Sequence, residues 1–250
     1  MSHLHLPDGI IPIFWLALGF AATALMLALA LRNAREADSA RRLPRLGIVA
    51  ALMLIGMMAE IAIIGYHINL SVLGGILLGP WLGFIAAFLV NIILALFGHG
   101  GITVIGLNSL IIGSETILGW AIFRALKKKL NPRASAAATV VITLTLSTTL
   151  MVGIIALTQT QPALAFAGPE AGAPLITFEL VAAAEEHPIT QIDLARFAQL
   201  VYFFGAIGWV IEAAFTALVV GFFARARPEL LAGDPRARLN KENHFGTRAD

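Results

Sequence analysis

Residues 66–80 have the sequence YHINLSVLGGILLGP, and this stretch decides the fold that we predict. Its first four residues, which include His67 and Asn69, form a short polar break between two apolar regions. The apolar run that follows, 70–79, is too short to cross a hydrocarbon core of about 30 Å alone as a straight helix. Backbone that leaves a helix at membrane depth must be buried in protein or line a cavity. We therefore predict a broken segment in the middle of a membrane domain.

Six further apolar runs flank this stretch, with approximate bounds 10–31, 46–65, 81–97, 107–126, 134–157 and 197–224. Hydrophobic residues make up 58% of the 250 residues and charged residues only 13%, whereas a soluble domain carries roughly 25% charged residues. Since several runs approach the roughly 20 residues that cross a bilayer, we predict an all-α, polytopic integral membrane helix bundle of about seven spans. This number counts 70–79 as a kinked or thin crossing that packs against its neighbours.

The basic residues fall almost entirely on one side of this topology. With the N-terminus outside and every run crossing once, the inward segments are 32–45, 124–133 and 225–250. They hold five, five and six Lys and Arg residues, which is 16 of the 17, and only Arg196 lies outside. Because basic loops stay on the cytoplasmic side, we predict an external N-terminus and a cytoplasmic C-terminus. No basic segment precedes the first apolar run, so the N-terminus does not resemble a cleavable signal peptide.

The chain shows no internal repeat and no separate soluble domain. We divide it into a membrane domain, 1–228, which includes a polar external loop at 158–196, and a polar cytoplasmic tail, 229–250. The absence of cysteine excludes disulfides and thiolate metal sites. The net charge is only +2, and the basic residues flank membrane spans, so topology explains them better than nucleic-acid binding does.

The predicted topology brings most histidines to the outer face. The residues placed there are His3, His5, Asp8, His67, His99 and His187, whereas His244 lies inside. A neutral imidazole nitrogen is the commonest transition-metal ligand, and a nitrogen-rich set without thiolates suits nickel, copper, cobalt or zinc rather than calcium or magnesium. Histidines near span ends are also common as interfacial polar residues. That interpretation is favoured for His187, which follows two glutamates in the polar loop.

The extreme N-terminus offers a more specific chelator. A free α-amine, a deprotonated amide and the imidazole of a histidine at position two supply three nitrogens, and one more imidazole completes a square plane typical of Ni(II) or Cu(II). If Met1 is removed, the chain begins with Ser2 and His3 and has this arrangement. If Met1 stays, the amine, two amides and His3 form a related chelate. His5 is a further donor in either case.

Five motifs occur in order along the chain. They are His5-Leu6-Pro7-Asp8-Gly9, His67-Ile68-Asn69, Gly79-Pro80, Gly98-His99-Gly100-Gly101-Ile102-Thr103, and Glu212 with Arg227-Pro228-Glu229-Leu230-Leu231. With the predicted topology, they resemble the CbiM/NikM family, the cobalt and nickel substrate-capture subunits of energy-coupling-factor transporters. The resemblance extends over residues 3–231.

This resemblance implies a seven-span subunit in a bacterial or archaeal cell membrane, with Ni2+ or Co2+ as the transported ion. It implies metal ligands from the terminal amine, the following amide and imidazole, and a loop histidine that corresponds to His67. The position-two histidine is His5 by its distance from Pro-Asp-Gly and His3 by its distance from a processed terminus, and both assignments stay open. The implied partners are two cytoplasmic ATPase subunits, a membrane coupling subunit and a small accessory membrane subunit.

Other polar residues have supporting roles. Asp8 can accept a hydrogen bond from a ligand imidazole, although a helix N-cap explains it equally well. Asn69 can hold the loop that carries His67, and His99 can support the site or satisfy only the backbone of its glycine loop. Glu60 and Glu212 lie inside apolar runs, where an ionisable residue is expensive and a functional role is the default expectation.

The chain has no P-loop, since none of its four lysines follows a Gly-x-x-x-x-Gly pattern. We therefore expect a non-enzyme whose ATP hydrolysis is carried out by partner subunits. The alternatives are an ATP-independent secondary transporter or channel, a receptor that binds metal without importing it, and a membrane metalloenzyme. A metalloenzyme is disfavoured because the chain has neither His-Glu-x-x-His nor Gly-x-Ser-x-Gly.

Overall fold

The computed structural model describes residues 11–35, 39–61, 66–98, 100–158 and 194–231. Their elements are α1 (Ile13–Arg35), α2 (Ser39–Met58), β1 (Glu60–Ile61), β2 (Tyr66–His67), α3 (Ser71–Leu78), α4 (Pro80–Leu96), α5 (Ile105–Leu126), α6 (Pro132–Leu157), α8 (Leu194–Ala226) and η3 (Pro228–Leu230). By length and composition, four described helices, α1, α5, α6 and α8, are suited to cross a membrane. Shorter apolar segments lie in α2 (Leu43–Met58) and in α4. The prediction of an all-α, multi-pass membrane bundle is confirmed.

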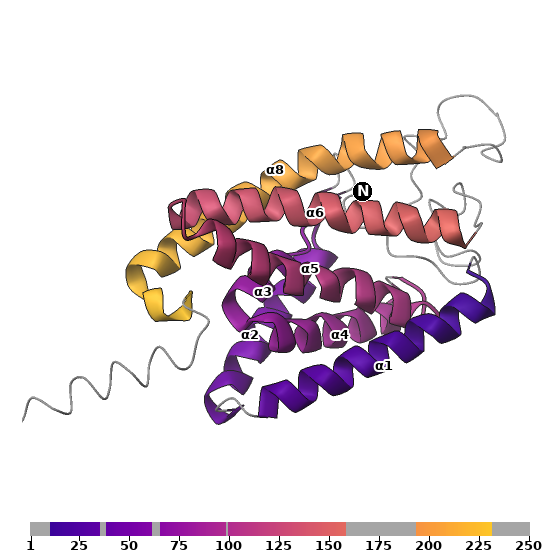
Figure 1. The fold of residues 1–250 in the computed structure, drawn as a ribbon, viewed down its shortest axis with the longest axis horizontal. Coiled ribbons are helices and arrows are strands. Elements are labelled where there is room, and N and C mark those ends of the chain that lie inside the picture. The colour runs from indigo at the N-terminus through magenta and orange to yellow at the C-terminus, as the bar shows by residue number, and fades with distance from the viewer. Residues whose placement is uncertain (1–10, 36–38, 62–65, 99, 159–193, 232–250) are drawn as a thin grey trace, which may run out of the picture.

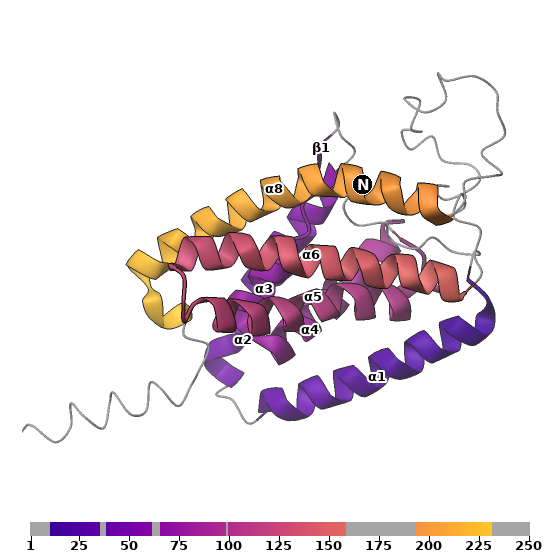
Figure 2. The same ribbon diagram turned by 45° about the horizontal axis from the view of Figure 1, so that its top comes forward.

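The helices form a layered bundle, in which α6 and α8 pack together on one face and α1 lies on the opposite face (Figures 1 and 2). Between these layers, α5 packs against both α4 and α6. The turn from α5 to α6 and the end of α8 lie at the same end of the bundle in both views. This end, which we call the basic end, carries Arg124, Lys127, Lys128, Lys129, Arg133, Arg225 and Arg227. The charge asymmetry expected from the sequence is therefore present in the fold.

The second predicted span, 46–65, is wrong at its boundaries. Helix α2 begins at Ser39 and ends at Met58, and β1 then pairs antiparallel with β2 so that Glu60 lies opposite His67. Isoleucines follow Glu60, and β-branched residues lose side-chain freedom in a helix while favouring extended backbone. An apolar run alone does not distinguish these two conformations.

Helix α3 is a short helix inside the bundle, as the broken pattern of residues 66–80 predicted. Its eight residues rise about 12 Å, less than half of the hydrocarbon core. Left-handed backbone precedes it at Leu70, with φ 57°, and Gly79, with φ 83°, separates it from α4. The described ranges contain seven α-helices, but α3 is too short to be a full-length span.

Small residues allow α3 and α4 to approach α5 closely. A Cβ added at Gly75 would lie 2.0 Å from the Thr116 carbonyl oxygen, and one at Gly83 would lie 2.9 Å from Cβ of Thr116. Ala86 and Ala87 are fully buried. These small side chains thus serve close helix contacts within this chain.

We expect the variant Gly75→Ala to lower the free energy of unfolding by about 1–3 kcal/mol, because the new methyl group overlaps backbone that cannot rotate away. The measurement is unfolding of the purified protein in detergent, followed by circular dichroism. The matched control is Gly153→Ala on α6, where an added Cβ meets nothing within 4 Å. Equal stability of the two variants would contradict the packing described for α3 and α5.

Candidate functional site

Two carboxylates lie in the interior of the bundle, close to the chain break before α3. Glu115 on α5 and Glu212 on α8 are both 0% exposed. A buried carboxylate is costly unless hydrogen-bond donors surround it. The donors here come from the segment that follows His67 and from α6, so the two glutamates join elements that are distant in the sequence.

Glu115 accepts three side-chain hydrogen bonds. One carboxylate oxygen, Oε2, accepts from Asn69 Nδ2 at 2.5 Å and also from the hydroxyl of Ser71. The other, Oε1, accepts from the hydroxyl of Ser147 at 2.5 Å. All three donors are buried. The carboxylate therefore links α6, the first residue of α3 and the loop that precedes it.

Glu212 binds the backbone of the same loop. Its Oε1 accepts the Leu70 amide at 3.2 Å, and its Oε2 accepts the Asn69 amide at 3.3 Å. Amides just before and within the first turn of a helix have no partner inside it, and the positive end of the helix favours an anion. Since Leu70 has left-handed backbone, both amides turn toward α8, and the carboxylate satisfies them together.

His67 is placed by this arrangement. It ends β2, opposite Glu60 in the two-residue ladder, and its side chain is half-buried, with Nδ1 in the protein interior. Two residues further on, Asn69 donates its backbone N–H to Glu212 and its side-chain N–H to Glu115. The backbone on both sides of His67 is thus held, by the pairing with β1 and by the hydrogen bonds of Asn69.

The structure brings together three residues that were singled out from the sequence: His67, Asn69 and Glu212. The backbone of Glu60, in β1, pairs with the backbone of His67. The other predicted site residues, Ser2, His3, His5, Asp8 and His99, lie outside the described residues. In the part of the chain that the structure describes, no three histidine, aspartate or glutamate side chains form a cluster that could hold a metal ion. The N-terminal chelate therefore remains a prediction.

Glu115, Ser71 and Ser147 were not predicted from the sequence to belong to this site. A signal for Glu115 was present, because it is an ionisable residue within the apolar run 107–126, and the same rule singled out Glu212. No comparable signal marked the serines, whose hydroxyls are common in membrane helices and usually bond to their own helix. Their role depends on contacts between residues 32 and 44 positions apart.

The chain matches one protein-family model over residues 5–230, and that model is described as the cobalt uptake substrate-specific transmembrane region. A cobalt transport protein, CbiM, of Geobacter sulfurreducens is 29% identical over 133 residues, which are 50% of this chain and 38% of that protein. A fused nickel transport protein, NikMN, of Rhodobacter capsulatus is 27% identical over 258 residues, 97% of this chain and 67% of that protein. The chain therefore spans only part of the length of these relatives.

A solved structure has the same fold. The crystal structure of a transition metal transporter superposes with a TM-score of 0.71 and 24% sequence identity, and the alignment covers 94% of this chain and 99% of that one. At this identity the likeness concerns the fold alone.

The hydrogen bond between Glu115 and Ser147 can be measured with a double-mutant cycle. We expect Glu115→Gln and Ser147→Ala to be non-additive, with a coupling energy of about 1–2 kcal/mol in the free energy of unfolding in detergent. The control cycle pairs Glu115→Gln with Thr145→Ala, because the Thr145 hydroxyl donates to the Val141 carbonyl of its own helix. That cycle should be additive. A coupling energy near zero for Ser147 would contradict the bond.

Proposed function

The chain belongs to the family of cobalt uptake substrate-specific transmembrane proteins, and from this membership we propose that it is the metal-capturing membrane subunit of an energy-coupling-factor importer for Ni2+ or Co2+. The family match over residues 5–230 is the observation that carries the proposal. The relatives named for cobalt and nickel transport support the choice of these two ions.

The fixed position of His67 supports its role as a metal ligand. A binding group that is already ordered loses less conformational freedom when the ligand arrives. The hydrogen bonds from Asn69 and Leu70 to Glu115 and Glu212 supply this order. We assign the two glutamates a positioning role, since their carboxylate oxygens already accept hydrogen bonds from the loop and from α6.

The remaining ligands in this proposal come from the N-terminus. The terminal amine, an amide nitrogen and the imidazole of His3 or His5 would provide three nitrogens, and His67 the fourth. A four-nitrogen square plane suits Ni(II), and nitrogen donors also suit cobalt. Asp8 and His99 remain candidates for supporting hydrogen bonds.

Energy for uptake would come from other chains. We propose two cytoplasmic ATPase subunits and a membrane coupling subunit as partners, with a small accessory membrane subunit. The competing function is an ATP-independent secondary transporter. Proteoliposomes that contain this chain alone distinguish the two functions, because a secondary transporter would move nickel or cobalt down a gradient without ATP.

We expect His67→Ala to weaken nickel and cobalt binding by at least about 100-fold, since loss of a ligand is more severe than loss of a group that only orients one, which typically costs 10- to 100-fold. The measurement is isothermal titration calorimetry on the purified full-length chain. His187→Ala is the matched control, because that histidine was assigned to the polar loop and not to the site. Wild-type affinity in His67→Ala would rule out His67 as a ligand.

The N-terminal ligands can be tested by metal analysis and intact-mass spectrometry of protein with an untagged N-terminus, grown with nickel and cobalt together. We expect one nickel or cobalt ion per chain. A mass that corresponds to removal of Met1, with metal loss in His3→Ala but not in His5→Ala, assigns His3. The reverse pattern assigns His5. A protein that binds neither ion at micromolar concentration would overturn the proposed function while leaving the membrane fold intact.

A further inference from the structure

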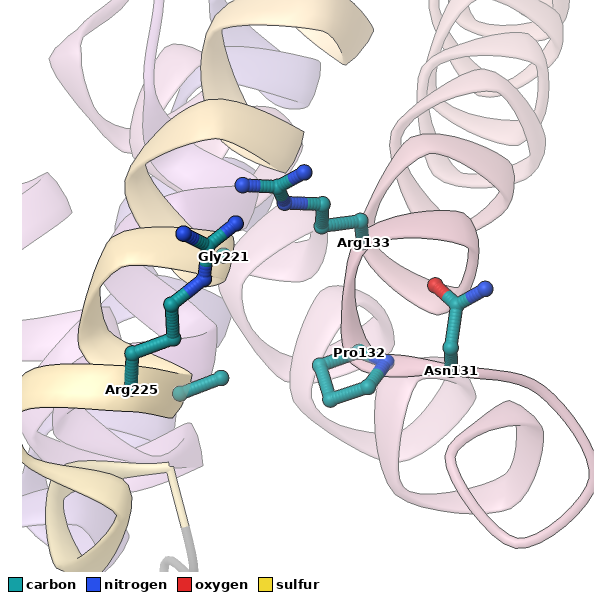
Figure 3. A pocket seen from close by; sticks show the side chains of 6 residues that line it. Asn131, Pro132, Arg133, Gly221 and Arg225 are labelled. Atoms are coloured by element: carbon teal, nitrogen blue, oxygen red, sulfur yellow. The ribbon is translucent and has the colours of Figure 1, made fainter.

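A second polar feature lies at the basic end, away from the site around His67. It is a cavity of about 370 Å³ between the start of α6 and the end of α8. The residues that line it are Asn131, Pro132, Arg133, Gly221, Ala224 and Arg225. Figure 3 shows the side chains of Arg133 and Arg225 extending toward each other and into this cavity from the two helices.

The Arg133 side chain packs directly against the backbone of α8 at Gly221. A Cβ added at Gly221 would lie 2.2 Å from the Arg133 Nε atom and 2.7 Å from its Cγ atom, so the arginine occupies the space that only a glycine leaves open. In the described ranges, neither Arg133 nor Arg225 forms an ion pair with a carboxylate. Two guanidinium groups directed into one cavity repel each other, and an anion between them would relieve that repulsion.

The backbone at this place adds to the positive potential. Helix α6 begins at Pro132, and the Asn131 side chain accepts the Ala134 amide at 2.9 Å as an N-cap. The positive end of the helix dipole therefore lies at the cavity. Pro132 and Ala224 provide an apolar wall beside the charged groups.

The cavity lies where the apolar surface of the bundle ends. On α8, Leu218 is 66% exposed and Phe222 is 65% exposed, and Arg225 follows within one turn. Leu130, next to Asn131, is 44% exposed. Exposed apolar side chains on a membrane helix face the hydrocarbon, so the two arginines are at the level of the lipid headgroups.

We propose that this cavity binds the phosphate-bearing headgroup of an anionic phospholipid. The guanidinium groups of Arg133 and Arg225 donate paired hydrogen bonds to the phosphate oxygens, which the planar fork of arginine suits better than a lysine ammonium does. The glycerol and the first methylenes of the acyl chains lie against Pro132 and Ala224. Basic pockets between membrane helices on the cytoplasmic side bind such headgroups. An acidic segment of a partner protein would match the charge, but it would gain less from the apolar wall at the hydrocarbon boundary.

The test is native mass spectrometry of the purified full-length chain, released from detergent that contains equal amounts of phosphatidylglycerol and phosphatidylcholine. We expect the wild type to retain one phosphatidylglycerol molecule in preference to phosphatidylcholine. Removing both arginines in Arg133→Ala/Arg225→Ala should weaken this retention by roughly 30-fold. The control Lys128→Ala/Lys129→Ala removes the same charge from the neighbouring loop and should retain the lipid.

A third variant changes no charge. In Gly221→Ala the new methyl group must displace the Arg133 side chain, which can swing into solvent because Arg133 is exposed. We expect this variant to lose the lipid as well, while Gly153→Ala on α6 retains it. Nickel binding should be unchanged in all of these variants, which separates the outcome from that of the proposed function.

Three results would overturn the proposal. Equal loss of lipid in the arginine and lysine variants would show that only the overall surface charge matters. Displacement of the lipid by millimolar inorganic phosphate would show that the site takes the free ion. No preference for phosphatidylglycerol, combined with loss of co-purification of the coupling subunit in Arg133→Ala/Arg225→Ala, would assign the cavity to a protein contact.

Discussion

A carboxylate buried inside a membrane bundle must receive hydrogen bonds from the groups around it, and Glu115 receives three. These bonds come from Asn69, Ser71 and Ser147, so one side chain on α5 holds both α6 and the start of α3. Water cannot replace these donors in the interior of the bundle. The position of α3, and with it the loop that carries His67, depends on this interaction.

The buried carboxylates and the irregular backbone supply each other's hydrogen-bond partners. The break before α3 leaves the amides of Asn69 and Leu70 without helical partners, and Glu212 accepts both. Glu212 in turn would be an uncompensated charge if the chain simply continued as a helix through this region. The close contact of Gly75 with Thr116 lets α3 approach α5 closely enough for Ser71 to reach Glu115. The short helix α3, the chain break before it and the two buried glutamates therefore form one structural unit.

Hydropathy and charge predicted the helical runs, the break at residues 66–69, the interruption at Gly79 and the gathering of basic residues at one end, because each depends on local composition. The end of α2 at Met58 could not be predicted in the same way, since isoleucine-rich sequence suits a strand and a buried helix alike. The sequence also indicated His67, Asn69 and Glu212, but not that Glu115 accepts a hydrogen bond from the Asn69 side chain and others from serines on two further helices. Such contacts depend on how helices pack, which no local pattern encodes. The N-terminal chelate remains a prediction, because residues 1–10 lie outside the described part of the chain.

The two polar regions of the molecule are built on the same pair of helices. Helix α6 contributes Ser147 to the interior network and Arg133 to the cavity, and α8 contributes Glu212 and Arg225. In each helix the two residues are 13 or 14 positions apart, which corresponds to about 20 Å along the axis. The helices α6 and α8 pack against each other, and a displacement of either one along its axis would reach the loop of His67, through Glu212 for α8 and through Ser147 and Glu115 for α6. The carboxylates resist such movement, because it would break hydrogen bonds that water cannot replace.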